Sequence, residues 1–142
     1  MDPTINAPIA APSAAYSGIA DADHKLTIVL GASDNPNRYS FRTLNRLRDK
    51  RHPVIAIGRK KVRVADVDIQ TEAPALEGVD TVTLYLNRGN QRDYYDYLLS
   101  LNPKRIIFNP GAENPELSIL AKAQGIEVVN ACTLVLLSTG QF

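Results

Sequence analysis

A polar loop at residues 31–40, with the sequence GASDNPNRYS, has the residue types that bind phosphate groups. The apolar run before it, Leu26 to Leu30, predicts a buried strand. A helical pattern follows from Ser40, with one apolar face made by Phe41, Leu44 and Leu47. A strand, a glycine-led loop and a helix together direct backbone N–H groups at an anion. The loop has no GxGxxG motif, and any strand-to-helix turn needs glycine and polar residues, so alone it fits an ordinary connection equally well.

A second group of candidate residues follows the next predicted strand, Val54 to Ile57. It reads Gly58, Arg59, Lys60, Lys61. A dinucleotide site that prefers NAD has an acidic residue at this place, which binds the ribose hydroxyls. Cations there instead favour a ligand with an added phosphate near the adenosine, and NADP and coenzyme A both have one.

The cations also have a plainer interpretation. Ten of the sixteen Lys and Arg residues lie between Arg38 and Arg63. A solvated helix face accounts for five of them: Arg42, Arg46, Arg48, Lys50 and Arg51. It accounts less well for Arg38 and for residues 59–61, because those lie where a ligand would bind.

Catalytic groups are scarce in this sequence. Of the two histidines, His24 falls in the N-terminal tail and His52 at a helix end, where we expect it to be exposed and far from the loops. Glu113 fits a helix-start acid, and Cys132 fits a small buried apolar residue. We find no nucleophile–base arrangement and no metal-ligand cluster, so no catalytic or metal-binding residue is predicted.

Composition sets limits on the class of protein. The chain has 142 residues, which suits one domain, and a net charge of +1, which gives no general attraction to nucleic acid or anionic membranes. A single cysteine cannot form an internal disulfide, so a cytoplasmic location is the default expectation. No apolar run approaches the roughly 20 residues of a membrane-spanning helix.

The first 24 residues are rich in Ala, Pro and Ser and contain neither Lys nor Arg. This composition is typical of a flexible tail or an added extension, not of a signal peptide. We therefore expect residues 1–24 to be such a tail or extension, of which residues 1 to about 21 contribute little stability, and residues 25–142 to form the domain.

Strand and helix patterns alternate through the domain. Five strands are predicted, starting near Leu26, Val54, Thr81, Arg105 and Ile126. The helices between them are expected at residues 40–51, from an N-cap at Asn90 to Leu101, and from an N-cap at Asn114 to Gly125. Residues 62–69 have the pattern of a short extended excursion, and residues 132–137 that of a strand or short helix. Such alternation predicts an α/β fold with a parallel sheet, whose ligands bind beyond the carboxyl ends of the strands.

Five segments in order resemble the small stand-alone CoA-binding domain proteins, whose domain is similar to the CoA-binding domain of the succinyl-CoA synthetase alpha subunit. The segments are GASDNPNRYS, IGRKK, VDTVTLYLN, NPGAENPEL and GIEVVNACTLVLL. The resemblance covers about residue 25 to the C-terminus. It implies a Rossmann-like, three-layer, doubly wound sheet of five parallel strands in the order 3-2-1-4-5.

The resemblance also implies a site for coenzyme A or an acyl-CoA. The pyrophosphate would lie on Gly31, Ala32 and Ser33, with Arg38, Tyr39 and Ser40 beside it. The adenosine 3′-phosphate would face Gly58, Arg59 and Lys60, where many relatives have Asn-Pro. The pantetheine side would be lined by Asn109, Pro110 and Gly111. Ligase chemistry is not implied, because the chain has neither a phosphorylated-histidine segment nor a second domain.

Three functions remain open on the sequence. The leading hypothesis is a CoA- or acyl-CoA-binding module without catalysis of its own. The alternatives are an NADP-dependent oxidoreductase, for which a substrate domain and a proton donor are missing, and a protein-interaction domain that has lost its ligand. The expected partner is a small nucleotide ligand, not nucleic acid or membrane, and a protein partner or homo-oligomer stays open.

Overall fold

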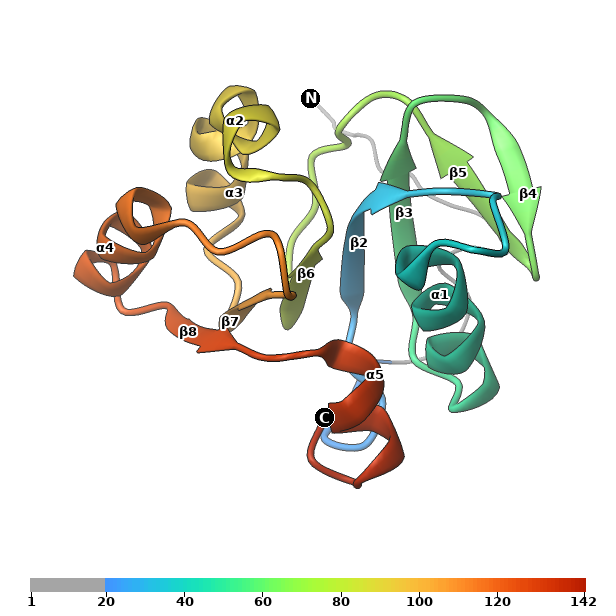
Figure 1. Cartoon of the computed structure of the whole chain (residues 1–142). Helices are drawn as coiled ribbons and strands as arrows, with labels where there is room; N and C mark the ends of the chain where they lie inside the picture. The colour runs from blue at the N-terminus through green and yellow to red at the C-terminus, as the bar shows by residue number, and fades with distance from the viewer. Residues whose placement is uncertain (1–19) are drawn as a thin grey trace, which may run out of the picture.

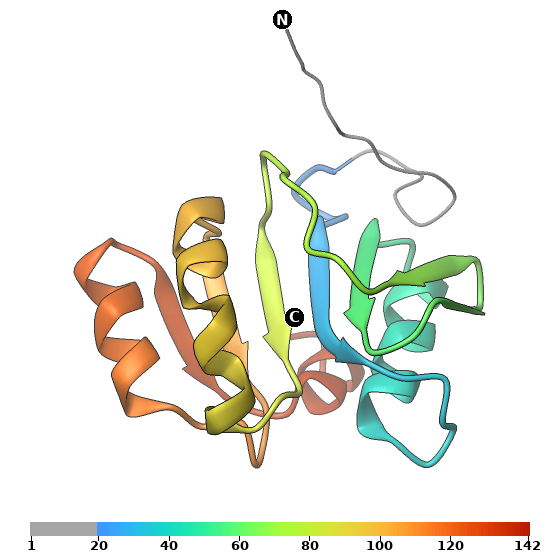
Figure 2. The same cartoon turned by 90° about the horizontal axis from the view of Figure 1, so that it is seen from above.

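The computed structural model describes residues 20–142, so expectations about residues 1–19 lie outside the described part. Figure 1 shows the sheet with helices on both sides, and Figure 2 shows the same elements from above. The strands are β2 (Thr27–Ala32), β3 (Val54–Gly58), β4 (Val62–Val64), β5 (Val67–Gln70), β6 (Thr81–Leu84), β7 (Arg105–Phe108) and β8 (Glu127–Asn130). The helices are α1 (Tyr39–Asp49), α2 (Arg88–Gln91), the 3₁₀ turn η2 (Arg92–Tyr94), α3 (Tyr95–Leu101), α4 (Pro115–Ala123) and α5 (Thr133–Ser138).

The sheet has seven strands in the order β4-β5-β3-β2-β6-β7-β8. All neighbours pair in parallel except β4 and β5, which form an antiparallel hairpin. The predicted α/β class is confirmed, whereas the five-stranded 3-2-1-4-5 order is wrong for the strands predicted. Those five strands lie in the order 2-1-3-4-5, because the segment expected as a short excursion adds β5 beside β3, where Ala56 faces Ile69.

Helices cover both faces of the sheet, so the molecule has three layers (Figure 2). The strand residues alternate between two cores, as the pleat requires. Ile28 and Leu30 of β2 point to the core under α3 and α4, whereas Val29 points to the core under α1 and α5. Both faces of the central strands are therefore buried. The strand order reverses between β2 and β6, and ligands of such sheets bind at the carboxyl edge beside this reversal.

Two helix starts differ in how well the sequence predicted them. Asn114 caps α4, since its side chain accepts a hydrogen bond from the Leu117 N–H, and Pro115 is the first helical residue, as predicted. The expected cap at Asn90 is wrong. Asn87 caps α2 by accepting from the Asn90 N–H, and the expected single helix to Leu101 is divided into α2, η2 and α3.

Candidate functional site

The carboxyl edge of the sheet collects the three predicted groups of ligand-binding residues, and Figure 1 looks onto this edge. The first group begins with the last two residues of β2, and the second begins with the last residue of β3. These strands are paired so that Ala32 lies opposite Gly58. The third group follows β7, which is two strands from β2 on the other side. With strands about 4.8 Å apart, the edge from β3 to β7 spans roughly 14 Å. An elongated ligand could contact all three groups at once.

Gly31 brings two loops into contact at the centre of the edge. Its φ is +95°, a conformation that side chains disfavour. A Cβ there would lie 3.1 Å from the carbonyl carbon of Tyr85 and 3.2 Å from the backbone nitrogen of Leu86. The glycine is therefore required for the close approach of the loop after β2 to the loop after β6.

The loop between β2 and α1 leaves the start of the helix open. The Ser33 hydroxyl accepts from the Asn35 N–H at 3.0 Å, and the Asn35 side chain accepts from the Asn37 N–H at 2.9 Å. Arg38 occupies the N-cap position in an extended conformation but gives no side-chain cap, and the first turn contains no acidic residue. The positive end of the helix dipole thus faces the edge without a carboxylate to neutralise it, which suits an anion.

The predicted cations surround this helix start. Arg38, Arg59 and Lys60 are all exposed. Lys60 lies 3.3 Å from the Asp34 carboxylate, so this ion pair links the loop after β3 to the loop after β2. Within residues 20–142, neither Arg38 nor Arg59 forms an ion pair. These two guanidinium groups are available to an anionic ligand.

The other residues of the first two groups are close to backbone. Tyr39 is 63% exposed, whereas the side chain of Ser40 is buried beneath the start of α1. Gly58 is half-buried, and a Cβ on it would lie 2.3 Å from the Ala32 carbonyl oxygen. The backbones of β2 and β3 are thus in close contact at this point, which lies between the residues predicted for the pyrophosphate and those predicted for the 3′-phosphate.

Both polar atoms of the Asn109 side chain form hydrogen bonds within the protein. Its amide donates to the Thr83 hydroxyl at 2.7 Å and to the Leu84 carbonyl at 2.9 Å, and its oxygen accepts from the Thr133 N–H at 2.8 Å. The residue is 2% exposed. It therefore fixes β6, β7 and α5 relative to one another, while Pro110 and Gly111 after it are exposed on the edge.

Sequence reasoning missed the residues that hold the edge loops together. Gln91 is fully buried, and its amide donates to the carbonyls of Leu86 and Ala112 at 2.9 and 2.7 Å. Asn114 donates to the Gln91 oxygen at 2.9 Å. This network joins the loop after β6 to the loop after β7. The sequence indicated only the capping role of Asn114. The contacts of Gln91 with Ala112 and Asn114 join residues 21 and 23 positions apart, and its contact with Leu86 has no capping or periodic signal.

A tyrosine just after β6 connects the edge to α1. The hydroxyl groups of Tyr85 and Thr43 share a hydrogen bond. Burial raises the pKa of the Tyr85 phenol above its ordinary value, so the group is protonated at neutral pH. It acts here as a fixed hydrogen-bonding group and not as a general base.

Two other residues weighed in the sequence are explained by local structure. The Glu113 carboxylate accepts from the Gly111 N–H at 2.9 Å, which stabilises the turn after β7. Cys132 is half-buried just before α5, so the expectation of a fully buried thiol is only partly met. Among residues 20–142, no group of His, Cys, Asp or Glu has the arrangement of a metal site.

Arg48 departs from the expectation of a solvated helix face. Its guanidinium forms two hydrogen bonds to the Asp66 carboxylate, at 2.8 and 2.7 Å, and donates to the His52 carbonyl at 2.7 Å. The pair lowers the pKa of Asp66 and raises that of Arg48. Arg48 therefore connects α1 to the β4–β5 hairpin, while Arg42 and Arg46 remain exposed.

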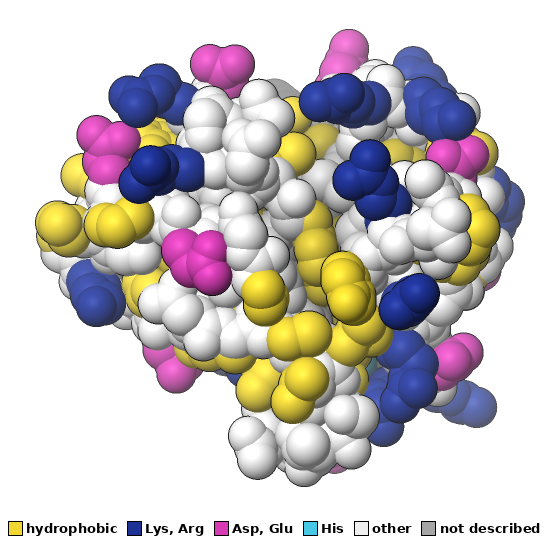
Figure 3. Space-filling model, viewed as in Figure 1, with side chains coloured by type: hydrophobic (Ala, Val, Ile, Leu, Met, Phe, Trp, Pro, Cys, Tyr) yellow, Lys and Arg dark blue, Asp and Glu magenta, His cyan; other side chains and the backbone are white. Residues whose placement is uncertain are grey.

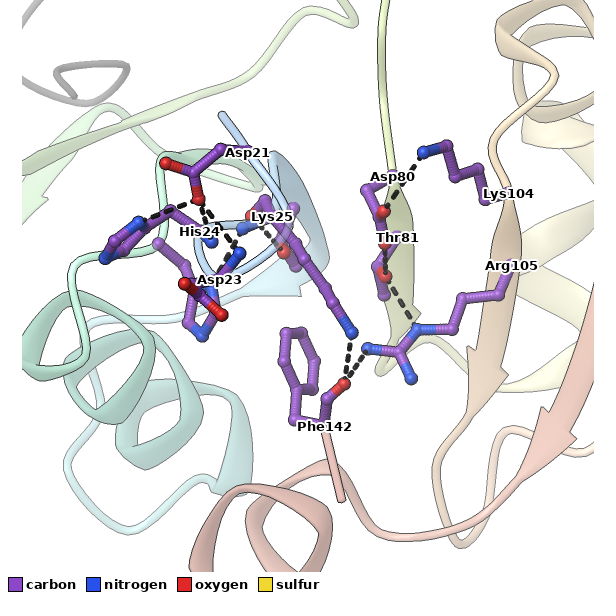
Figure 4. Close-up of polar contacts among 11 residues, drawn as sticks. Asp21, Asp23, His24, Lys25, Asp80, Thr81, Lys104, Arg105 and Phe142 are labelled. Atoms are coloured by element: carbon purple, nitrogen blue, oxygen red, sulfur yellow. Dashed lines mark hydrogen bonds and ion pairs between the residues drawn. The ribbon is translucent and has the colours of Figure 1, made fainter. Parts of the chain in front are cut away.

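His52 is at the opposite edge of the sheet, as predicted, but it is buried and not exposed. It is 6% exposed, and its Nδ1 accepts from the Lys25 N–H at 2.9 Å. The Phe142 ring lies 5.0 Å from the imidazole, and Figure 4 shows Lys25 and Arg105 converging on the Phe142 carbonyl. Burial, followed by the nearby charges of His24, Lys25, Arg105 and Lys50, lowers the pKa of His52 to about 4.

The surface of the carboxyl edge has an apolar band beside a basic region. In Figure 3, hydrophobic side chains run from the middle of this face down over α5, and Lys and Arg side chains border the band on the side of α1. A hollow of about 480 Å³ lies between α1 and α5, and another of about 490 Å³ lies along the β4–β5 hairpin. Lys61 lines the second hollow, but neither hollow is lined by the residues expected to bind the pyrophosphate or by Arg59 and Lys60. Backbone N–H groups and exposed cations can hold a phosphate without an enclosing cavity. No helix in residues 20–142 is long and apolar enough to cross a membrane.

Comparison with known proteins places this geometry in a family. The profile of the CoA binding domain matches residues 25–138. A solved structure described only as an uncharacterized protein is 51% identical, covers 84% of this chain and 98% of its own, and has a TM-score of 0.81. A protein from Thermus thermophilus is 23% identical over 84% of this chain and 91% of its own, with a TM-score of 0.74.

A hypothetical protein from Pyrococcus horikoshii is 20% identical over 79% of this chain and 80% of its own, with a TM-score of 0.71. At such low identities, the last two similarities show the fold alone. The family match extends over nearly all of the domain that was expected from residue 25 onward. On this match, the chain belongs to the CoA-binding domain family.

Proposed function

We propose that the protein binds coenzyme A or an acyl-CoA across the carboxyl edge of its sheet. The observation that carries the proposal is the open start of α1, which has no capping side chain and no acid, beside two arginines that form no ion pair within residues 20–142. Membership of the CoA-binding domain family supports the same ligand. The pyrophosphate would bind at Gly31, Ala32 and Ser33, with Arg38 beside it.

The adenosine 3′-phosphate is proposed to bind at the end of β3. Arg59 and Lys60 are exposed there, and the Asp34 carboxylate already holds Lys60 on the side of the phosphate loop. Pro110 and Gly111 are exposed two strands from β2, on the side proposed for the pantetheine arm. The ligand would thus extend from β3 toward β7.

The proposed activity is binding without catalysis. Two titratable groups at the edge are engaged in structural hydrogen bonds, Glu113 in a turn and Tyr85 with Thr43. One observation favours a second candidate, an NADP-dependent oxidoreductase, since cations at the end of β3 would also suit the 2′-phosphate of NADP. The relative affinities for CoA and NADP distinguish these two functions.

Titration calorimetry with CoA, dephospho-CoA and NADP tests the proposal. A charge-assisted contact to phosphate is worth about 1.5–3 kcal/mol, so CoA should bind roughly 10–100-fold tighter than dephospho-CoA. Arg59→Ala should remove much of this ratio, and Arg38→Ala should weaken both ligands alike, since both contain the pyrophosphate. Lys122→Ala, a charge loss at the far end of α4, serves as the control and should change neither affinity.

Each outcome assigns a different function. Equal affinities for CoA and dephospho-CoA would remove the 3′-phosphate contact. Tighter binding of NADP than of CoA would favour the oxidoreductase. If no adenine nucleotide binds, the domain acts through protein interaction instead.

A further inference from the structure

A groove between α1 and α5 has no role in the proposed phosphate site. It has a volume of about 480 Å³, within the range of roughly 300–1,000 Å³ typical of small-ligand sites. Its walls are mainly apolar and include Phe41 of α1 and Leu134 and Val135 of α5. Val135 is 55% exposed, so its side chain is accessible to a ligand in the groove.

The groove exists because α5 uses only one side for packing. Thr133 and Leu137, which are four residues apart, are buried against the sheet and α1. Leu134 and Val135 follow Thr133 and face away from that contact, Leu134 being half-buried and Val135 exposed. The apolar side chains left open therefore line the groove.

The groove is continuous with the carboxyl edge. Both helices begin at this edge, α1 after the phosphate loop and α5 after β8, and the start of α5 is fixed by the Asn109–Thr133 hydrogen bond. Phe41 is in the first turn of α1, directly after Ser40. The apolar band in Figure 3 runs from the middle of the edge down over α5, so an apolar chain leaving the edge would follow the surface into the groove.

The charges at the groove select an anionic ligand. Arg42 and Arg46 line it, both are exposed, and no lining residue is acidic. The Arg42 guanidinium lies 5.4 Å from the centre of the Tyr39 ring, which holds the cation close to the start of α1. An apolar floor with a cationic border suits an apolar chain that is attached to negatively charged groups.

We propose that this groove binds the acyl chain of an acyl-CoA whose nucleotide lies on the carboxyl edge. The inference rests on the proposed function and adds the class of ligand to it: an acyl-CoA with an apolar chain of several methylene groups, in preference to free CoA. Phe41, Leu134 and Val135 contact the chain, while Arg42 and Arg46 attract the anionic ligand.

Calorimetry with CoA and octanoyl-CoA on the whole chain tests the inference. Burial of a few methylene groups should make octanoyl-CoA bind about 10–100-fold tighter than CoA. Val135→Asp places a carboxylate in the groove and should remove most of this preference while leaving the CoA affinity within about twofold. Ile119→Asp is the matched control, because Ile119 is 68% exposed on α4 and should leave both affinities unchanged. Circular dichroism would confirm that both variants fold.

The outcomes separate this inference from the proposed function. If CoA binds but octanoyl-CoA binds no tighter, the acyl groove is refuted and CoA binding stands. If Val135→Asp weakens CoA as strongly as octanoyl-CoA, the groove does not discriminate acyl chains and the inference is overturned. If sedimentation velocity shows a dimer that Val135→Asp dissociates, the groove is an interface between copies and not an acyl site. If neither compound binds, both proposals fail.

Discussion

Replacing His52 with asparagine should remove a large part of the acid sensitivity of the fold. His52 is neutral in the folded protein, because its Nδ1 accepts the Lys25 N–H and because the charged groups around it are cations. Protonation would eliminate that acceptor and place a further positive charge beside Lys25 and Arg105. An asparagine oxygen can accept the same N–H, but it does not titrate.

The magnitude follows from the two pKa values. The pKa of His52 is lowered from 6.5 to about 4 in the folded state. Between these values the unfolded chain binds more protons than the folded one, so the free energy of unfolding decreases as the pH falls. The contribution of His52 is complete above pH 6.5 and is lost progressively as the pH falls toward 4. A pKa shift of one unit corresponds to about 1.36 kcal/mol, so the free energy of unfolding should fall by roughly 2–3 kcal/mol over this window.

Urea unfolding at pH 7.5, 6.0, 5.0 and 4.5 measures this loss. Carboxylates titrate in both proteins, so the difference between wild type and His52→Asn isolates the histidine. Wild type should lose about 2–3 kcal/mol more than the variant between pH 7.5 and 4.5. His24→Asn should reduce this loss only in part, because burial is the largest cause of the lowered pKa of His52 and the charge of His24 comes second. Parallel curves for wild type and His52→Asn would refute the reasoning.

Two further substitutions test the edge itself. Gly58→Ala should lower the melting temperature by about 4–12 °C, because the added Cβ meets the Ala32 carbonyl and overpacking costs roughly 1–3 kcal/mol. Gly89→Ala is the control and should lower it little in the same thermal scan, because its Cβ would lie 3.6 Å from the nearest atom, the Asn87 side-chain oxygen. Equal effects of the two substitutions would contradict the predicted clash at Gly58. Asn109→Ala should reduce the free energy of unfolding in urea by about 2–4 kcal/mol, since it leaves buried donors and acceptors unpaired. Unchanged stability with lost CoA affinity would instead make Asn109 a ligand contact.

The local features of the fold were predictable from the sequence. Apolar runs gave the start of β2 within one residue, and Asn114 followed by Pro115 gave the start of α4. Such signals depend on neighbouring residues in the chain. The strand order was not predictable in the same way, because the pairing of β5 with β3 depends on which of several short extended segments packs beside the core.

The site shows the same division between local and long-range information. The sequence predicted that Gly31, Arg38 and Arg59 lie at one edge, since strand ends meet there in a parallel sheet. It did not indicate that Asp34 pairs with Lys60. It also placed His52 at the correct end but on the surface, because the burial of this ring depends on Phe142, ninety positions later.

The β4–β5 hairpin also determines how the sheet ends. An unpaired strand edge can recruit strands from other molecules unless it is short, charged or covered. The outer strand β4 has only three residues, and its exposed Arg63 is held by Asp68 across the hairpin at 2.8 Å. The opposite edge, β8, has four residues with exposed polar side chains at both ends, Glu127 and Asn130. Neither edge offers a long apolar strand for edge-to-edge addition, so the sheet resists aggregation at both ends, and any self-association of the described domain would use helix faces or loops.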